Sequence, residues 1–80
     1  MALGSRDDVR EGMIVVGSDG GIIGTVKEVR NTDLLVSRSL ERDVYVPLNA
    51  IHNVIENLVS LNIPAEQVSS MHWPEPPLGE

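Results

Sequence analysis

Few residues of this chain could do chemistry, and the most suggestive of them form a glycine-rich segment. Residues 19–26 read Asp-Gly-Gly-Ile-Ile-Gly-Thr-Val, one residue away from the Gly-x-Gly-x-x-Gly-x-Val loop that covers nucleotide phosphates. Asp19 replaces the first glycine of that loop, and its carboxylate would repel a phosphate. No helical pattern follows Gly24, so no helix N-terminus is available to bind one. The segment is better explained as the turn of a β-hairpin.

The two histidines are the only imidazole groups, and they do not predict a metal site. His52 and His72 stand far apart in the chain, neither has a partner at metal-ligand spacing, and the sequence has no cysteine. We expect His52 to begin a strand and His72 to end a helix, where a positive charge is favourable. No metal and no cofactor is predicted.

The remaining nucleophiles and acids also have ordinary explanations. No serine stands in a Gly-x-Ser-x-Gly elbow. Lys27, the only lysine, is followed by Glu28 on a predicted strand, which favours a surface position. The acids Asp7-Asp8, and Glu41 with Asp43, lie in polar segments where water explains them. We therefore predict no catalytic residues and a protein that is not an enzyme.

Composition limits the partners and the compartment. The chain has 80 residues and a net charge of −6, which suits one small domain and disfavours nucleic acid and anionic membranes as partners. Tyr45 and Trp73 are the only aromatic residues, too few to stack single-stranded nucleic acid. No signal peptide or membrane-spanning run is visible. We expect a cytoplasmic protein with an aliphatic core.

The elements that position these residues begin with a hairpin. Apolar runs at 13–16 and 22–29 are joined by Asp19-Gly20-Gly21, which is typical of a strand-turn-strand unit. Gly24 inside the second run predicts a bulge or a close backbone approach. The first run is apolar at every position, so its outer face is either covered or used for association. Ile14 and Val16 are therefore candidate interaction residues.

Four further strands are predicted, at 34–37, 43–47, 51–55 and 58–61. The first two form a hairpin with a longer loop, in which Val44 and Val46 face the core and Pro47 ends the strand. The last two flank Glu56-Asn57, a two-residue turn in which we expect Asn57 to take the left-handed conformation.

The C-terminal part predicts a short helix and a tail. Residues 62–71 read as one amphipathic helix with Pro64 in its first turn, capped by Asn62 or Ile63, and with Pro64, Val68 and Met71 on one face. Residues 72–80 form a proline-rich tail that we expect to be extended and largely unpacked. Trp73 is a candidate anchor, either on its own barrel or in a neighbour's groove. Residues 1–8 are expected to be a flexible arm, and 9–71 the domain.

Together these elements predict a mainly β fold, a small antiparallel barrel of about six short strands with one short C-terminal helix. The hairpin resembles the PRC-barrel superfamily, and specifically a bacterial family of small stand-alone proteins of unknown function. The matching residues lie between Val9 and Leu61 and are Gly12-Met13, Val15, Ser18-Asp19-Gly20, Gly24, Val26, Val46-Pro47 and Ile51. The resemblance implies an adaptor or assembly role and supplies no catalytic positions.

Three functions follow as hypotheses. The first is a non-enzymatic protein–protein interaction module that self-associates, because its strands are apolar beyond one face. The second is a ribosome-assembly or RNA-associated factor, which requires a basic stripe formed by Arg6, Arg10, Lys27, Arg30, Arg38 and Arg42. The third is a small hydrolase that uses His52 or His72, with a serine or carboxylate within hydrogen-bond reach.

Overall fold

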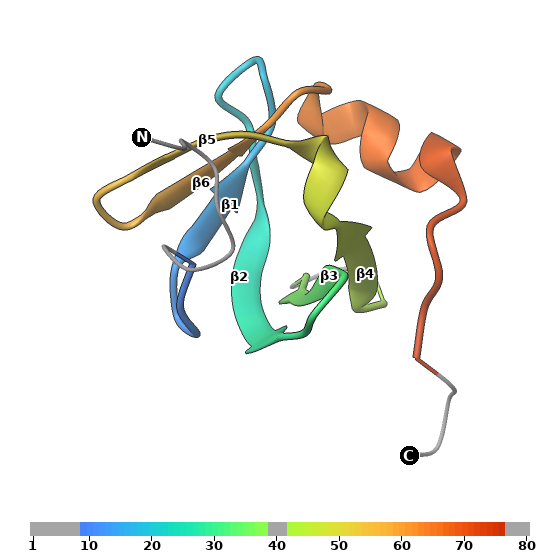
Figure 1. Cartoon of the computed structure of the whole chain (residues 1–80). Coiled ribbons are helices and arrows are strands. Elements are labelled where there is room, and N and C mark those ends of the chain that lie inside the picture. The colour runs from blue at the N-terminus through green and yellow to red at the C-terminus, as the bar shows by residue number, and fades with distance from the viewer. Residues whose placement is uncertain (1–8, 39–41, 77–80) are drawn as a thin grey trace.

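One curled β-sheet makes up most of the molecule. The computed structural model describes residues 9–38 and 42–76 and is mainly β, as predicted (Figure 1). The six strands lie in the order β4-β3-β2-β1-β6-β5. Their bounds, with those of two 3₁₀ helices, are β1 Ile14–Val16, β2 Ile22–Val29, β3 Asp33–Ser37, β4 Val44–Pro47, η2 Leu48–Ala50, β5 Ile51–Ile55, β6 Leu58–Leu61 and η3 Ala65–Met71.

The two edges of the sheet approach each other, so the sheet is a half-barrel. β4 and β5 lie at opposite ends of the strand order, yet only the three residues of η2 separate them along the chain. Such a short connection requires the sheet to curl until its edges meet at that corner. Each edge strand still has a single strand neighbour within the described part of the chain. The sheet is therefore curled but open, where a closed barrel was expected.

The expectation of an entirely antiparallel sheet is wrong at one pairing. β1 and β6 are parallel, with Ile14 beside Leu58, whereas the four other pairings are antiparallel. The crossing through η2 brings the β5–β6 hairpin to the free side of β1. The hairpin arrives with β6 running in the same direction as β1, and β1 becomes an interior strand.

The first hairpin forms as predicted, and of the two alternatives predicted for Gly24 the close backbone approach is found at Gly24 itself, with a bulge at the neighbouring Ile23. Gly20 has φ +84°, and the Gly17 N–H donates a hydrogen bond of 2.8 Å to the Gly21 carbonyl. The register shifts between Val15 and Val16, which leaves Ile23 as the extra residue of a bulge. A side chain on Gly24 would collide with the Ser37 carbonyl oxygen. Only glycine allows β2 and β3 to approach so closely there.

The core is entirely aliphatic among the described residues, as predicted. It contains no buried polar or charged side chain there. Strand alternation places Val15, Val59 and Val46 inside, each with 0% exposure. Val29, Leu48, Ile51, Val54, Ile63, Ala65 and Trp73 pack around it from partly exposed positions. No helix in this part of the chain is long and apolar enough to cross a membrane.

The C-terminal helix differs from the prediction in type, start and face. It is a 3₁₀ helix of seven residues that begins at Ala65, and Pro64 is its N-cap without a side-chain hydrogen bond. Because a 3₁₀ helix repeats every three residues, Ala65 rather than Pro64 lies on the face of the buried Val68. Met71, at the last turn, is 40% exposed and does not join the core.

The β5–β6 turn assigns the left-handed conformation to a different residue. Glu56 has φ +51°, whereas Asn57 was expected to adopt it. Both favoured two-residue turn types require a positive φ at the first central position. Position in the turn therefore outweighs the intrinsic preference of asparagine.

Candidate functional site

Apolar side chains gather on the outer face of the sheet. Because paired residues share a face, the register places Ile55, Leu58 and Ile14 in one row across β5, β6 and β1. In the next outward row Val16 lies beside Ile22 of β2. We call these five residues the outer stripe.

The exposure of the outer stripe is highest at its two ends. Ile22 is 75% exposed at one end, and Ile55 is 55% exposed at the other, next to Leu58 at 42%. Ile14 and Val16, the residues selected from the sequence, are both half-buried at the centre. A contiguous apolar patch of this kind is typical of interaction surfaces.

Sequence reasoning missed Ile22, Ile55 and Leu58. Leu58 becomes part of the stripe only through the parallel pairing of β1 with β6, which brings segments 44 positions apart side by side. The alternation of Leu58 with the buried Val59 was a signal for its outward direction. This alternation gave no information on which strand would pair with β6.

A second surface lies at the other edge of the sheet, where residues 73–76 run beside β4 (Figure 1). The Tyr45 N–H donates a hydrogen bond of 2.8 Å to the Pro74 carbonyl. The Arg42 Nη2 donates one of 2.6 Å to the Pro76 carbonyl. The expectation of an unpacked tail is therefore wrong for Trp73–Pro76, while residues 77–80 lie outside the described residues. We call the surface that holds this segment the tail groove.

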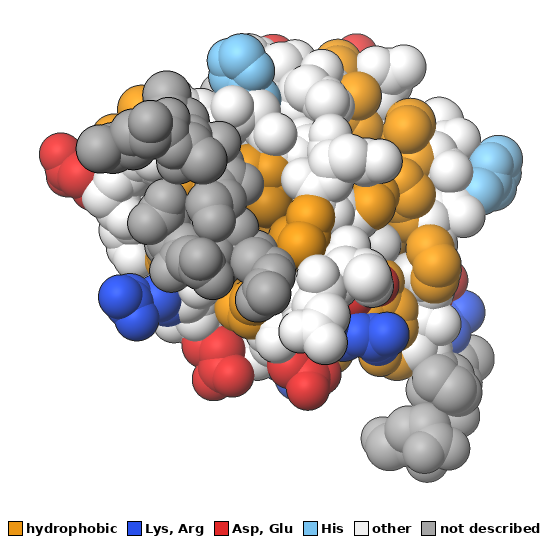
Figure 2. Space-filling model, in the orientation of Figure 1, with side chains coloured by type: hydrophobic (Ala, Val, Ile, Leu, Met, Phe, Trp, Pro, Cys, Tyr) orange, Lys and Arg blue, Asp and Glu red, His pale blue; other side chains and the backbone are white. Residues whose placement is uncertain are grey.

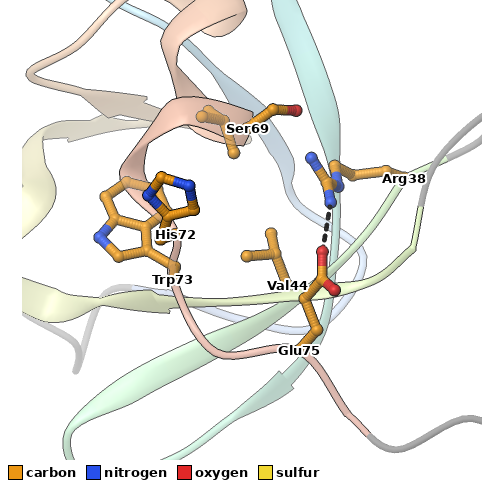
Figure 3. A pocket seen from close by; sticks show the side chains of 7 residues that line it. Arg38, Val44, Ser69, His72, Trp73 and Glu75 are labelled. Atoms are coloured by element: carbon orange, nitrogen blue, oxygen red, sulfur yellow. Dashed lines mark hydrogen bonds and ion pairs between the residues drawn. The ribbon is translucent and has the colours of Figure 1, made fainter.

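Two arginines hold the one acid of this tail segment. Arg38 Nη2 lies 3.4 Å from Glu75 Oε2, and Arg42 Nη1 lies 3.1 Å from Glu75 Oε1. The Arg38 side chain is only 9% exposed, and its Nε donates a hydrogen bond of 2.6 Å to the Arg42 carbonyl. Figure 3 shows the guanidinium pointing at the carboxylate beside Val44. The pairing fixes the direction of both arginines.

Trp73 lies on the far side of the same hollow. A cavity of about 240 Å³ separates Trp73 and His72 from Arg38 and Glu75, and Ser69 points into it (Figure 3). The indole packs against the core of its own chain in this structure. The structure does not bring Trp73 together with Ile14 and Val16, which belong to the outer stripe.

Four of the basic side chains that were expected to form an RNA-binding stripe are paired with acidic side chains. Lys27 Nζ lies 3.1 Å from Asp43 Oδ2, and Arg30 Nε lies 3.0 Å from Asp33 Oδ1. Arg30 also stacks over the Tyr45 ring at 4.5 Å. Arg38 and Arg42 share Glu75, as described above, and Arg6 lies outside the described residues. These four basic residues and the acids paired with them therefore form a surface of mixed charge.

The histidines occupy separate places (Figure 2). His52 is exposed and lines a cavity of about 300 Å³ together with Gly17, Ser18, Ser60, Leu61 and Asn62. Within residues 9–38 and 42–76 no hydrogen bond joins its imidazole to either serine. His72 ends η3 with φ +56°. The described residues contain no group of three or more His, Asp or Glu that could hold a metal ion.

The fold and these two surfaces define a small, mainly β domain built on one curled six-stranded sheet. The chain belongs to DUF2171, a family of uncharacterised proteins conserved in bacteria, whose model matches residues 9–69. The matched region covers all six strands and the first five residues of η3. Among curated proteins, none matches the chain.

Proposed function

We propose that the chain is a cytoplasmic, non-enzymatic PRC-barrel-like assembly module that binds a second copy of itself through the outer stripe. The observation that carries the proposal is a patch of aliphatic side chains in two neighbouring rows: Ile14, Leu58 and Ile55 across β1, β6 and β5, and Val16 and Ile22 across β1 and β2. No charged side chain interrupts the five residues, so the face can pack against an identical face.

The shape of the stripe suits a two-fold contact. It is centred between β1 and β6, and its most exposed residues, Ile22 and Ile55, stand at opposite ends. A two-fold axis that passes between β1 and β6 sets Ile22 of one copy against Ile55 of the other, so both are covered at once. Sheets pack in this way at about 10 Å separation.

The magnitude of this contact predicts a weak dimer. Burying one large aliphatic side chain contributes roughly 1.5–3 kcal/mol, and a standard interface uses roughly 20–30 residues on each side. Five residues amount to a fraction of that, and the net charge of −6 adds repulsion between copies. We expect a dimer that forms with rising protein concentration and strengthens with salt.

Light scattering across a concentration series tests the proposal. The wild-type mass should rise from monomer toward dimer, whereas Ile22→Lys and Ile55→Lys should need a higher protein concentration to dimerise. Met71→Lys is the control, because Met71 is also an exposed large apolar residue, at 40%, but lies outside the stripe. A wild-type chain that stays monomeric at all concentrations, or stripe variants that dimerise like the control, would refute it.

The charge pattern supports a protein partner over a nucleic acid. A phosphate backbone would have to displace Asp33, Asp43 and Glu75 from four basic side chains before it could bind them. The RNA-associated alternative therefore predicts an RNA mobility shift that this proposal does not.

A further inference from the structure

We propose that the tail groove of one copy binds the segment Trp73–Pro76 of a second copy, so that two copies exchange tails. The inference goes beyond the outer stripe, because it uses the other edge of the sheet and a different set of residues. Its evidence is the way in which the chain holds its own tail.

The contacts that join the tail to β4 and its flank can form equally well between two chains. Tyr45 N–H to the Pro74 carbonyl, and Arg42 to both Glu75 and the Pro76 carbonyl, join the segment to β4 and its flank. None of them depends on the covalent link through His72. Exchange of an identical element therefore forms the same contacts and is a low-cost route to a dimer.

The hinge favours this exchange. His72 alone connects η3 to the tail, and it has φ +56°, a region that non-glycine residues adopt at a cost. Short, strained hinges promote swapping, because the open arrangement relieves the strain. A tail that leaves its own groove allows His72 to return to an ordinary backbone conformation.

The contacts of the tail groove also indicate which peptide segment it binds. An extended segment adds to the open edge of β4, a common mode of peptide binding. Glu75 stands between two prolines and reaches Arg38 and Arg42, while Trp73 lines the opposite side of the hollow. The groove is therefore suited to a Trp-Pro-Glu-Pro segment, and this segment is present in every copy of the chain.

The prolines also limit the assembly. Pro74 and Pro76 have no N–H to donate, so the docked segment offers little to a further strand. We expect tail exchange to stop at a closed pair rather than to continue into a fibre.

The experiment uses two full-length variants and the fluorescence of Trp73, the only tryptophan in the sequence. Arg42→Glu keeps the tryptophan but opposes Glu75 in its own groove, so its tail should be released and its emission red-shifted relative to wild type. Trp73→Ala keeps the groove and has no tryptophan signal. Titrating Trp73→Ala into Arg42→Glu should move the emission back toward the wild-type wavelength and saturate.

A second variant that removes the repulsion tests the specificity of the signal. Arg42→Glu with Glu75→Gln has no like charges at positions 42 and 75 and sets no cation against Arg38, so its emission should lie closer to that of wild type and respond less to added Trp73→Ala. Adding Ile55→Lys to the Trp73→Ala chain removes the outer-stripe contact but should leave the titration unchanged. The two proposals can therefore fail independently.

Two outcomes would overturn the inference. The first is an emission of the mixture that equals the sum of the separate spectra up to about 1 mM, the range of effective concentrations that a short linker provides. The second is a tail that stays docked in Arg42→Glu and also in Tyr45→Pro, which removes the N–H donor to Pro74. In that case the contacts named here would not be those that hold the tail.

Discussion

The carboxylate of Asp19 accepts a hydrogen bond of 3.3 Å from the backbone N–H of Ala65, 46 positions further along the chain. The same oxygen accepts one of 3.0 Å from the Gly21 N–H. One side chain therefore closes the first hairpin turn and caps the start of η3. Gly17 lies at the same contact, where a side chain would collide with the backbone of Ala65.

This contact predicts a pH-dependent stability. The hydrogen bond from Gly21, and then that from Ala65, lower the pKa of Asp19. A lowered folded-state pKa stabilises the protein above the unfolded-state pKa, and this contribution is lost as the pH falls through the folded-state value. We expect the difference in free energy of unfolding between wild type and Asp19→Asn to be largest near neutral pH, to begin to fall at the usual aspartate pKa of about 4, and to vanish only below the lowered folded-state pKa.

Urea titrations at a series of pH values measure this difference. Glu66→Gln, which removes an exposed acid from the first turn of η3, is the matched control. A difference for Asp19→Asn that stays constant with pH would show that the charge of Asp19 plays no part.

Gly24 should tolerate no side chain. Gly24→Ala places a methyl group against the Ser37 carbonyl, where only backbone could move to relieve the clash. We expect a loss of about 3 kcal/mol in the free energy of unfolding, the upper part of the range for overpacking. Gly20→Asn is the control, because space is open there and asparagine accepts a positive φ. Equal urea midpoints for the two variants would contradict the account of the β2–β3 approach.

Trp73→Ala should weaken the fold without abolishing it. The indole packs against the core from a half-buried position and is not among the buried core residues. We expect a loss of about 2 kcal/mol, less than for a fully buried tryptophan, and an unchanged far-ultraviolet circular dichroism spectrum. Met71→Ala, an exposed neighbour, should have little effect. A Trp73→Ala chain as stable as wild type would show that the tail adds nothing to the fold.

Asn53→Leu should stabilise the chain. The Asn53 Oδ1 is buried and has no hydrogen-bond partner among the described residues, a state that costs about 1–3 kcal/mol relative to a solvated amide. Leucine has a similar shape and no polar atom, so we expect a gain of about 1 kcal/mol in thermal or urea unfolding. A lowered midpoint would mean that the amide is needed where it stands.

The sequence correctly predicted the features that depend on local residue patterns. Alternation and glycine placement located β2 at 22–29 and both strands of the last hairpin, because these depend on neighbouring residues. The β1–β6 pairing could not be predicted, since the apolar positions Val15 and Val59 indicate a buried face but not an adjacent strand. The same limit hid most of the outer stripe.

The tail was misjudged for a related reason. Three prolines in residues 74–77 indicate a segment that forms no regular structure. That pattern does not show that Tyr45 would present an N–H at a sheet edge, or that Arg38 and Arg42 would meet Glu75. In the sequence, Asp19 was considered only as a residue that would repel a phosphate. Its hydrogen-bond partner Ala65 is too far along the chain for a local sequence pattern to connect the two residues.

The parallel pair also has a consequence for synthesis on the ribosome. β1 is the earliest strand of the sheet along the chain and β6 the latest, yet they are neighbours in the interior. A nascent chain that has not reached Leu61 can pair β1 with β2 but leaves its other side without a partner. Such an unpaired edge is prone to aggregate, so we expect the chain to be most prone to aggregation in the interval between the emergence of β1 and that of β6.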